Sequence, residues 1–326
     1  MISKHHGPGL TRRALAPALV GIAGLVLARP ARAQETIRIG LPTKAFWPTI
    51  VSDTAVRRKL FEREGIGVEP TIYRGGAECF EALAAGAADL VLDAPALTAA
   101  GLLKGVGSKV VACGSTTYSG WQLLVRQDSP ITDVMALAGK KVGITSMGSG
   151  SDLLAQWTMQ DRKLEFTRVP LGGGGLIPNL RSRNVDAAVV YSPLSFQQTA
   201  SGQARVLIDY ATAVPPHVNA GWIASDAVIR DKPDLVQKSL NALFGGVAAL
   251  RADRAAAVAL IAEVDEIAPD IATMEYEQTT LHLSADGVID HAMLVRGLEL
   301  ARLGGMTDMA PADQVYTTRF KPVPTV

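Results

Sequence analysis

The chain has 326 residues, of which 48% are hydrophobic and 19% are charged, and its 32 basic and 31 acidic side chains nearly balance. Without an export signal over residues 1–33, it keeps 27 basic and 31 acidic residues, a formal charge of −4. A mildly acidic chain lacks the concentrated basic face that nucleic acids and anionic membranes require, which excludes both as expected partners. The remaining length is typical of two domains.

Residues 1–33 have the pattern of a cleavable export signal. Two adjacent arginines (TRRAL) precede an apolar run over residues 14–28, and the residues ARA supply small side chains before a cleavage site at Gln34. TRRAL favours twin-arginine export, although an ordinary secretory signal with two neighbouring arginines has the same pattern. The apolar run is too short to span a bilayer, and no later run reaches about 18 apolar residues. We therefore expect an exported, soluble, periplasmic monomer.

From residue 36 onward, short apolar runs alternate with helical patterns. The predicted strands cover residues 36–41, 68–73, 89–92, 109–113, 120–126, 141–145, 166–170, 186–191, 204–208 and 219–224. The predicted helices cover residues 49–64, 77–85, 95–103, 131–138, 152–161, 176–183 and 194–201. Residues 231–304 are helical by pattern, with breaks at Arg254 and Pro269, and the Pro- and Thr-rich tail over 306–326 is expected to wrap the surface.

This alternation predicts an α/β protein with parallel sheets that are covered by helices on both faces. Residues 120–126 and 219–224 interrupt the rhythm, and we interpret them as two strands that cross between domains. The predicted domain I comprises residues 34–119 and 222–326, and domain II comprises residues 120–221. The helical segment after residue 231 is expected to pack on domain I. The two crossings form a hinge, and the loops at the carboxyl ends of the strands face a cleft between the domains.

The loop SMGSGS lies between the predicted strand 141–145 and the helix 152–161. Ser149 and Ser151 are good helix N-cap residues, and a helix N-terminus offers unpaired N–H groups and partial positive charge to an anion. In isolation, the loop is an ordinary helix cap. At a strand end that faces a cleft, it becomes the best anion-site candidate of the chain.

The other strand-end loops carry aromatic and hydroxyl groups. Lys44 lies beside Phe46 and Trp47 in the first loop, which suits an aromatic or alkyl anion, although the two rings could equally anchor the core. Asp93 is the only acid in these loops, so no paired carboxylates or activated nucleophile indicate catalysis. The four glycines over 172–175 lack the ending of a phosphate-binding loop and indicate a flexible turn.

The two cysteines and five histidines give no sign of a cofactor. Cys79 and Cys113 are compatible with a disulfide in an oxidising compartment or with two small core residues. No histidine of the mature chain lies at metal-ligand spacing, so we expect neither a metal nor a cofactor.

Several segments together resemble a known family: IRIGLPTKAFWP, EALAAGAADLVLDAPA, WQLLVRQDSPITDVMALAGKKVGIT, SMGSGS and DAAVVYSP. They are similar to the periplasmic substrate-binding proteins of ABC importers, of the nitrate/sulfonate/taurine type, which share their fold with thiamine-pyrimidine-synthase-like proteins. The likeness runs from Thr36 to Leu250. Met147 and the four consecutive glycines depart from the family pattern.

The resemblance implies a type II periplasmic binding protein with two doubly wound domains, a two-strand hinge and a ligand cleft. It also implies delivery of the ligand to an ABC permease and its ATPase. The ligand-binding positions that it implies are Lys44, Phe46, Trp47, Asp93, Ala94, Ser115, Thr116, Ser146, Gly148, Ser149, Ser151 and Tyr191, with Trp121 and Trp222 beside the crossings.

The sequence therefore predicts a non-catalytic receptor for a small organic anion, with an aromatic carboxylate or sulfonate preferred. Two alternatives stay open. The ligand could be neutral or heteroaromatic, such as a pyrimidine, or the chain could be an enzyme on the same fold. A receptor or sensor that works with another kind of partner is a further alternative.

Overall fold

The structure is a computed structural model that describes residues 34–324. The predicted export signal and its twin-arginine pattern lie outside the described residues. Within the described part of the chain, no helix combines the length and the hydrophobicity needed to cross a bilayer.

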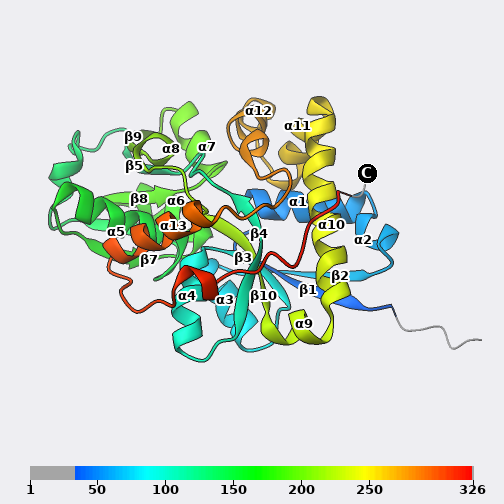
Figure 1. Cartoon of the computed structure of the whole chain (residues 1–326). Coiled ribbons are helices and arrows are strands. Elements are labelled where there is room, and N and C mark those ends of the chain that lie inside the picture. Colours follow the sequence, from blue (N-terminus) through cyan, green and yellow to red (C-terminus); the bar gives the residue numbers. More distant parts are fainter. Residues whose placement is uncertain (1–33, 325–326) are drawn as a thin grey trace, which may run out of the picture. The chain divides into compact units, whose positions relative to one another are not determined.

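The described chain builds two five-stranded sheets (Figure 1). The first sheet has the strand order β2-β1-β3-β10-β4, and the second has the order β7-β6-β8-β5-β9. The strands of the first sheet are β1 (Thr36–Leu41), β2 (Gly67–Ile72), β3 (Leu90–Asp93), β4 (Ser108–Ser115) and β10 (Ala220–Ser225). Those of the second are β5 (Gln122–Arg126), β6 (Lys141–Ile144), β7 (Thr167–Pro170), β8 (Ala187–Val190) and β9 (Ala204–Asp209).

Helices connect and cover these strands (Figure 1). The α-helices are α1 (Trp47–Arg57), α2 (Leu60–Arg63), α3 (Gly76–Ala84), α4 (Pro95–Leu103), α5 (Gly150–Arg162), α6 (Leu176–Arg181), α7 (Leu194–Ala200), α8 (Tyr210–Ala213), α9 (Asp226–Asp231), α10 (Pro233–Ala252), α11 (Arg254–Val264), α12 (Pro269–Gln278) and α13 (His291–Leu303). Short 3₁₀ turns are η1 (Val134–Leu137), η2 (Gly173–Gly175), η3 (Thr280–His282) and η4 (Ala312–Gln314).

The prediction of purely parallel sheets is wrong, because each sheet contains one inserted antiparallel strand. β10 lies between β3 and β4 and runs antiparallel to both, and β5 lies in the same way between β8 and β9. The segments interpreted as crossing strands are therefore inner strands of one sheet each. The chain passes between the sheets in the connections after β4 and β9.

Most predicted elements are confirmed, and two local differences have a clear cause. The helix predicted over 49–64 is interrupted between α1 and α2, where Lys59 adopts a left-handed backbone with φ 57°. That conformation cannot continue a right-handed helix. The helix predicted over 131–138 is the single 3₁₀ turn η1, which Asp133 caps by accepting a hydrogen bond from the Met135 N–H.

The helical segment after residue 231 begins and breaks near the predicted positions, with α11 starting at Arg254 and α12 at Pro269. Its packing differs from the prediction. The long helix α10 packs on α1 and β1 beside the first sheet. In contrast, α12 contacts α7, and α13 contacts both α4 and α5. The C-terminal segment thus packs against elements of both sheets. The division of the chain into domains at residues 119–120 and 221–222 stays a prediction.

The tail after α13 forms backbone hydrogen bonds with the first sheet. Tyr316 forms a parallel bridge with Val110 of β4, and the Thr317 N–H donates to the Val110 carbonyl oxygen. The tail then reaches α10, where the Gln237 side chain donates to the Lys321 carbonyl oxygen (Figure 1). It therefore pairs with the outer edge of the first sheet, which would otherwise leave backbone groups unpaired.

Candidate functional site

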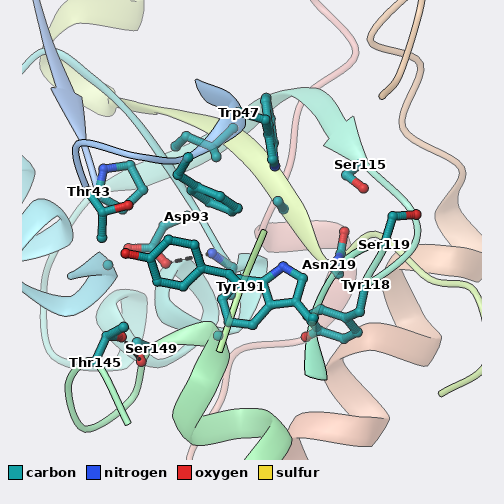
Figure 2. Close-up of a pocket in the computed structure, with 18 of the residues that line it drawn as sticks. Thr43, Trp47, Asp93, Ser115, Tyr118, Ser119, Thr145, Ser149, Tyr191 and Asn219 are labelled. Atoms are coloured by element: carbon teal, nitrogen blue, oxygen red, sulfur yellow. Dashed lines mark hydrogen bonds between the residues drawn. The ribbon is translucent and has the colours of Figure 1, made fainter. Parts of the chain in front are cut away.

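A pocket with a cavity volume of about 60 Å³ lies where the strand ends of the two sheets meet (Figure 2). Loops that follow β1, β2, β3 and β4 line it from the first sheet, and loops that follow β6 and β8 line it from the second. Its lining residues are Pro42, Thr43, Phe46, Trp47, Gly75, Gly76, Leu92, Asp93, Ala94, Ser115, Thr117, Tyr118, Ser119, Trp121, Thr145, Ser149, Gly150, Tyr191, Asn219, Ala220, Thr279 and Leu283.

Aromatic rings from both sides meet in this pocket. The Phe46 ring centroid lies 5.7 Å from that of Trp121 and 5.1 Å from that of Tyr191, and the Trp121 and Tyr191 centroids are 5.5 Å apart. Tyr118 extends the group through an edge contact with Trp121, and Trp47 extends it through a tilted contact with Phe46. These five residues, called the aromatic cluster below, offer ring faces and edges to a planar or alkyl ligand body.

In the loop between β1 and α1, Phe46 lines the pocket and Lys44 does not. Phe46 is the extended N-cap residue of α1, and Pro48 follows at a first-turn position, where its missing N–H costs nothing. The Lys44 side chain is 62% exposed and its Nζ lies 2.7 Å from a carboxylate oxygen of Glu266. That hydrogen bond raises the pKa of Lys44. Lys44 does not line the pocket.

The SMGSGS loop forms a closed hydroxyl network at the start of α5. Ser149 caps the helix by accepting from the Asp152 N–H, and its own hydroxyl donates to the Ser146 carbonyl oxygen over 2.7 Å. The Ser151 Oγ accepts from the Thr145 N–H over 2.8 Å and lies 2.9 Å from the Thr145 Oγ1. The Ser146 Oγ is buried without a partner among the described residues, whereas the hydroxyls of Ser149 and Ser151 are hydrogen-bonded inside the protein. They fix the α5 N-terminus, whose first residues Ser149 and Gly150 line the pocket.

Asp93, at the end of β3, is the one acidic residue among the pocket lining and is only 7% exposed. Its Oδ1 accepts from the Ala94 N–H over 2.8 Å, while its Oδ2 is buried without a hydrogen-bond partner. Burial raises the pKa of Asp93 to about 7, and the bond from Ala94 offsets this rise only in part. No Lys, Arg or His lines the pocket in the described chain.

A polar wall follows β4 and the start of β10. The Ser115 Oγ donates to the Thr117 carbonyl oxygen, and the Asn219 Nδ2 donates to the same oxygen, both over 2.9 Å. The Asn219 Oδ1 is buried and has no partner. Figure 2 shows this wall beside Tyr118, and its residues Ser115, Thr117, Ser119 and Asn219 all line the pocket.

Of the fourteen positions that the sequence proposed as ligand-binding, eight line the pocket and six do not. The lining positions are Phe46, Trp47, Asp93, Ala94, Ser115, Trp121, Ser149 and Tyr191. The other six are Lys44, Thr116, Ser146, Gly148, Ser151 and Trp222. Ser151 is buried within the hydroxyl network, and Trp222 is a core residue, 2% exposed, with its ring against Trp47.

Sequence reasoning missed several lining residues, among them Thr43, Tyr118, Thr145 and Asn219. Thr43, Tyr118 and Thr145 lie in or beside strand-end loops, so listing each loop in full would have included them. Asn219 was not predicted because it precedes β10, a strand that is inserted antiparallel beside β3. This insertion places Gly221 of β10 opposite Asp93. Local alternation does not report that pairing.

The two cysteines lie outside the pocket lining. Cys79 and Cys113 are both buried free thiols, so the disulfide alternative is not formed in this structure. Burial raises the pKa of both thiols, to about 12 for Cys113, which disfavours the reactive thiolate at neutral pH.

Comparison with known proteins first defines the class and then the family. The fold matches that of the product of the Candida albicans gene CA3427, described as having the generic periplasmic binding protein fold, with a TM-score of 0.75 at 13% identity over 89% of this chain and 98% of that one. The chain thus has a periplasmic-binding-protein fold. Residues 53–257, more than half of the chain, match the family model described as NMT1/THI5 like. The protein belongs to the NMT1/THI5-like family.

Two further solved structures share the fold. The alkanesulfonate-binding protein SsuA from Xanthomonas axonopodis pv. citri, bound to MOPS, gives a TM-score of 0.75 at 20% identity over 88% of this chain and 99% of that one. The desulfurization enzyme DszB gives a TM-score of 0.60 at 16% identity over 88% and 97% of the two chains. At these identities, the likeness shows the fold alone.

Sequence relatives match over part of their length. A Bacillus subtilis protein named for aliphatic sulfonate binding is 27% identical over 54% of this chain and 53% of its own. A Brucella abortus protein named as a binding protein is 22% identical over 60% of this chain and 61% of its own. The chain therefore matches less than two thirds of the length of these relatives.

Proposed function

We propose that this protein is an exported, non-catalytic receptor of an ABC importer. It captures a small organic anion in the pocket between its two sheets and delivers the ligand to a membrane permease and its ATPase. The observation that carries the proposal is the pocket itself, which aromatic rings from both sides line at the carboxyl ends of the strands. Ligands of open α/β sheets bind at this place.

The aromatic cluster favours a ligand with a ring or an alkyl body. Phe46 contributes its ring from the first sheet, and Trp121 and Tyr191 contribute theirs from the second, so a ligand packed against the cluster would contact both sides at once. Rings held by core packing need little ordering on binding and bury much apolar area. A ligand of this kind stabilises the arrangement in which both sides meet.

The α5 N-terminus favours an acidic group on the ligand. The helix has 13 residues, its cap residue Ser149 and its first residue Gly150 line the pocket, and the Ser149 hydroxyl is already bonded inside the protein. The first-turn N–H groups and the positive end of the helix dipole therefore provide the donors for a carboxylate or sulfonate. Relatives named for sulfonate binding support an acid of this type.

The pocket favours binding over catalysis. DszB has the same fold, so the fold does not decide this question. Among the described lining residues there is no Cys or His, and the Ser149 hydroxyl contacts Thr145, Ser146 and Ser151 rather than a general base. A nucleophile needs an activating partner within hydrogen-bond distance, and the pocket offers none.

A neutral heteroaromatic ligand, such as a pyrimidine, is the second candidate. Asp93 favours it, because no basic side chain balances the carboxyl and its Oδ2 has no partner. A ring N–H would supply that partner without adding negative charge.

A thermal-shift panel on the purified protein tests the proposed function. The panel contains aromatic carboxylates, aryl and alkyl sulfonates, pyrimidines, sugars and simple cations. A ligand present at 100 times its Kd should raise the free energy of unfolding by about 2.7 kcal/mol. We expect organic acids to raise the unfolding temperature most. Stabilisation by sugars or cations alone would contradict the proposal, and stabilisation by pyrimidines alone would favour the second candidate.

A further inference from the structure

We propose that the ligand carries a hydrogen-bond donor, an amine or a ring N–H, in addition to its acid group, and that Asp93 is the residue that selects this donor. The inference rests on the proposed function, because it specifies which organic acids the same pocket accepts. Asp93 then acts as a specificity-determining residue, and the ligand has one polar group for each sheet.

The geometry of Asp93 carries this inference. Asp93 is the last residue of β3 and lines the pocket, and it is more than nine-tenths buried. Oδ1 is used by the Ala94 N–H, whereas Oδ2 has no partner among the described residues. A buried acceptor that stays unpaired costs free energy, and a donor on the ligand would remove that cost.

Among the described residues, the Ala94 N–H is the one hydrogen-bond donor to the Asp93 carboxyl. Gly76, the first residue of α3, packs so closely that a Cβ atom placed there would lie 2.6 Å from the Asp93 Oδ1. The side chain at position 76 must therefore be absent for the carboxyl to fit. The titratable groups around the pocket, Cys79, Tyr118 and Tyr191, have pKa values that burial raises, to about 12 for Tyr191, so they add no charge near pH 7. None of them is hydrogen-bonded to the Asp93 Oδ2.

A second unpaired acceptor lies beside the same strands. Asn219 precedes β10, in which Gly221 pairs with Asp93, and its Oδ1 is buried without a partner while its Nδ2 is bonded to Thr117. Among the described lining residues of the first sheet, the buried oxygens without a partner are therefore Asp93 Oδ2, Asn219 Oδ1 and the hydroxyl oxygen of Thr43, and the first two belong to groups that accept rather than donate. Figure 2 shows Asp93 and Asn219 around the aromatic cluster.

The two sides of the pocket therefore have opposite preferences. The α5 N-terminus on the second sheet presents donors, whereas Asp93 and Asn219 on the first sheet present acceptors. A ligand with only an acid group would pair with the α5 N-terminus on the second sheet and leave the like-charged Asp93 carboxyl unpaired on the first sheet. An acid that also bears an amine or ring N–H would satisfy both sides.

Ionisation of Asp93 makes the two ligand types respond to pH in opposite directions. Burial raises the pKa of Asp93 to about 7. Above that pH the carboxylate accepts strongly from a ligand N–H and repels a plain acid, and below it both effects fade. The affinity for an amino-substituted acid should fall as the pH drops from about 8 to 6, and the affinity for the plain acid should rise.

Isothermal titration with three matched probes tests the inference: benzoate, aminobenzoate isomers and aniline. The same measurements on the Asp93→Asn variant remove the charge and keep the shape. The Asp231→Asn variant makes the same charge change at an exposed position outside the pocket and serves as the control. We expect one aminobenzoate to bind the wild type at least about tenfold more tightly than benzoate at pH 8. This preference should disappear in Asp93→Asn and persist in Asp231→Asn.

Each other outcome has a defined meaning. If benzoate and all aminobenzoates bind equally well, the inference is overturned and the proposed function stands. If aniline binds alone and Asp93→Asn abolishes its binding, Asp93 selects a donor but the organic-acid proposal fails.

If no probe binds while other organic acids stabilise the protein, the same comparison is made with the amino-substituted form of those acids, and an equal affinity overturns the inference. Should Asp93→Asn fail to fold, equal pH slopes for plain and amino-substituted acids in the wild type overturn it.

Discussion

The two sides of the pocket use polar groups in contrasting ways. On the second sheet, Thr145, Ser149 and Ser151 bond to one another and to nearby backbone, so that their hydroxyls have partners inside the protein. On the first sheet, Asp93 and Asn219 are also buried, yet each keeps one oxygen without a partner among the described residues. The closed network holds a helix N-terminus in place, whereas the open acceptors have a structural reason to meet a ligand.

This difference separates positioning from recognition. Loss of a hydroxyl from the closed network should lower stability first, because a backbone N–H becomes unpaired inside the protein. Loss of the Asp93 charge should change which ligands bind, because no protein group depends on its Oδ2. Four substitutions test this comparison.

The largest effect is expected for Trp121→Ala, because the comparison has meaning only if a ligand occupies the space between the two sides. Trp121 contacts Phe46, Tyr118 and Tyr191 and lines the pocket. Removal of the indole should weaken ligand binding by about 100-fold, as for other buried aromatic anchors. Titration calorimetry with the best acid from the thermal-shift panel measures the change.

Trp157→Ala is the matched control, because Trp157 packs on Tyr210 and lies outside this pocket. It should leave the affinity within about threefold of wild type. An equal loss in both variants would show that the effect comes from general destabilisation.

Ser151→Ala tests the closed network. The Ser151 Oγ is fully buried and accepts from the Thr145 N–H, which would lose its partner. We expect the free energy of unfolding to fall by about 1–3 kcal/mol, with an affinity change of at most about threefold. Denaturant unfolding measures the first quantity and calorimetry the second, with exposed Ser201→Ala as the control. A large loss of affinity without a loss of stability would assign the hydroxyl to the ligand.

Glu275 tests whether a buried carboxyl outside the pocket behaves differently from Asp93. It lies on α12 beside the hydroxyls of Ser192 and Thr279, with Asp265 nearby, and burial raises the pKa of Glu275 from 4.5 to about 8. Between these values the folded state binds a proton that the unfolded chain has released. Stability should therefore fall as the pH rises from about 5 to 8.

Glu275→Gln should flatten this part of the pH profile, because the amide does not titrate. The unfolding temperature, measured at intervals from pH 5 to 8, should decline less steeply in the variant than in the wild type. Asp93 and Asp265, whose pKa values burial raises to about 7, would retain their own share of the decline. An unchanged slope in the variant would rule out Glu275 as its source.

The smallest effect is expected for Lys44→Ala, which removes the cation that the sequence placed at the ligand. Lys44 points to solvent and pairs with Glu266, and exposed pairs of this kind contribute little. Affinity for an organic acid should stay within about twofold of wild type in calorimetry. A loss of tenfold or more would show that Lys44 reaches the ligand and that backbone N–H groups are insufficient for the acid.

The sequence predicted the elements well where local pattern decides them. The strand over 36–41 and the helix over 95–103 have the predicted bounds, and Phe46, Asp93 and Ser149 line the pocket because they follow strand ends. Nonlocal features were not predictable in the same way. The antiparallel insertion of β10 brings Asn219 into the same pocket as Asp93, and the direction of Lys44 depends on Glu266, which is 222 residues away in the chain.

The state of each hydrogen bond was also beyond the sequence. From the sequence, the serines of SMGSGS and Asp93 were equally good candidates for ligand contacts. Only the three-dimensional arrangement shows that the Ser151 hydroxyl accepts a hydrogen bond from the Thr145 N–H and that the Asp93 Oδ2 has no partner among the described residues. Whether a buried polar atom has a partner depends on packing between distant segments.

A crystal structure of the protein with its tightest organic acid tests the central claim most directly. We predict an acid oxygen within about 3.2 Å of first-turn N–H groups of α5, with the ligand body against Phe46, Trp121 and Tyr191. An acid group that points to solvent, or a ligand bound outside the pocket between the two sheets, would contradict the account.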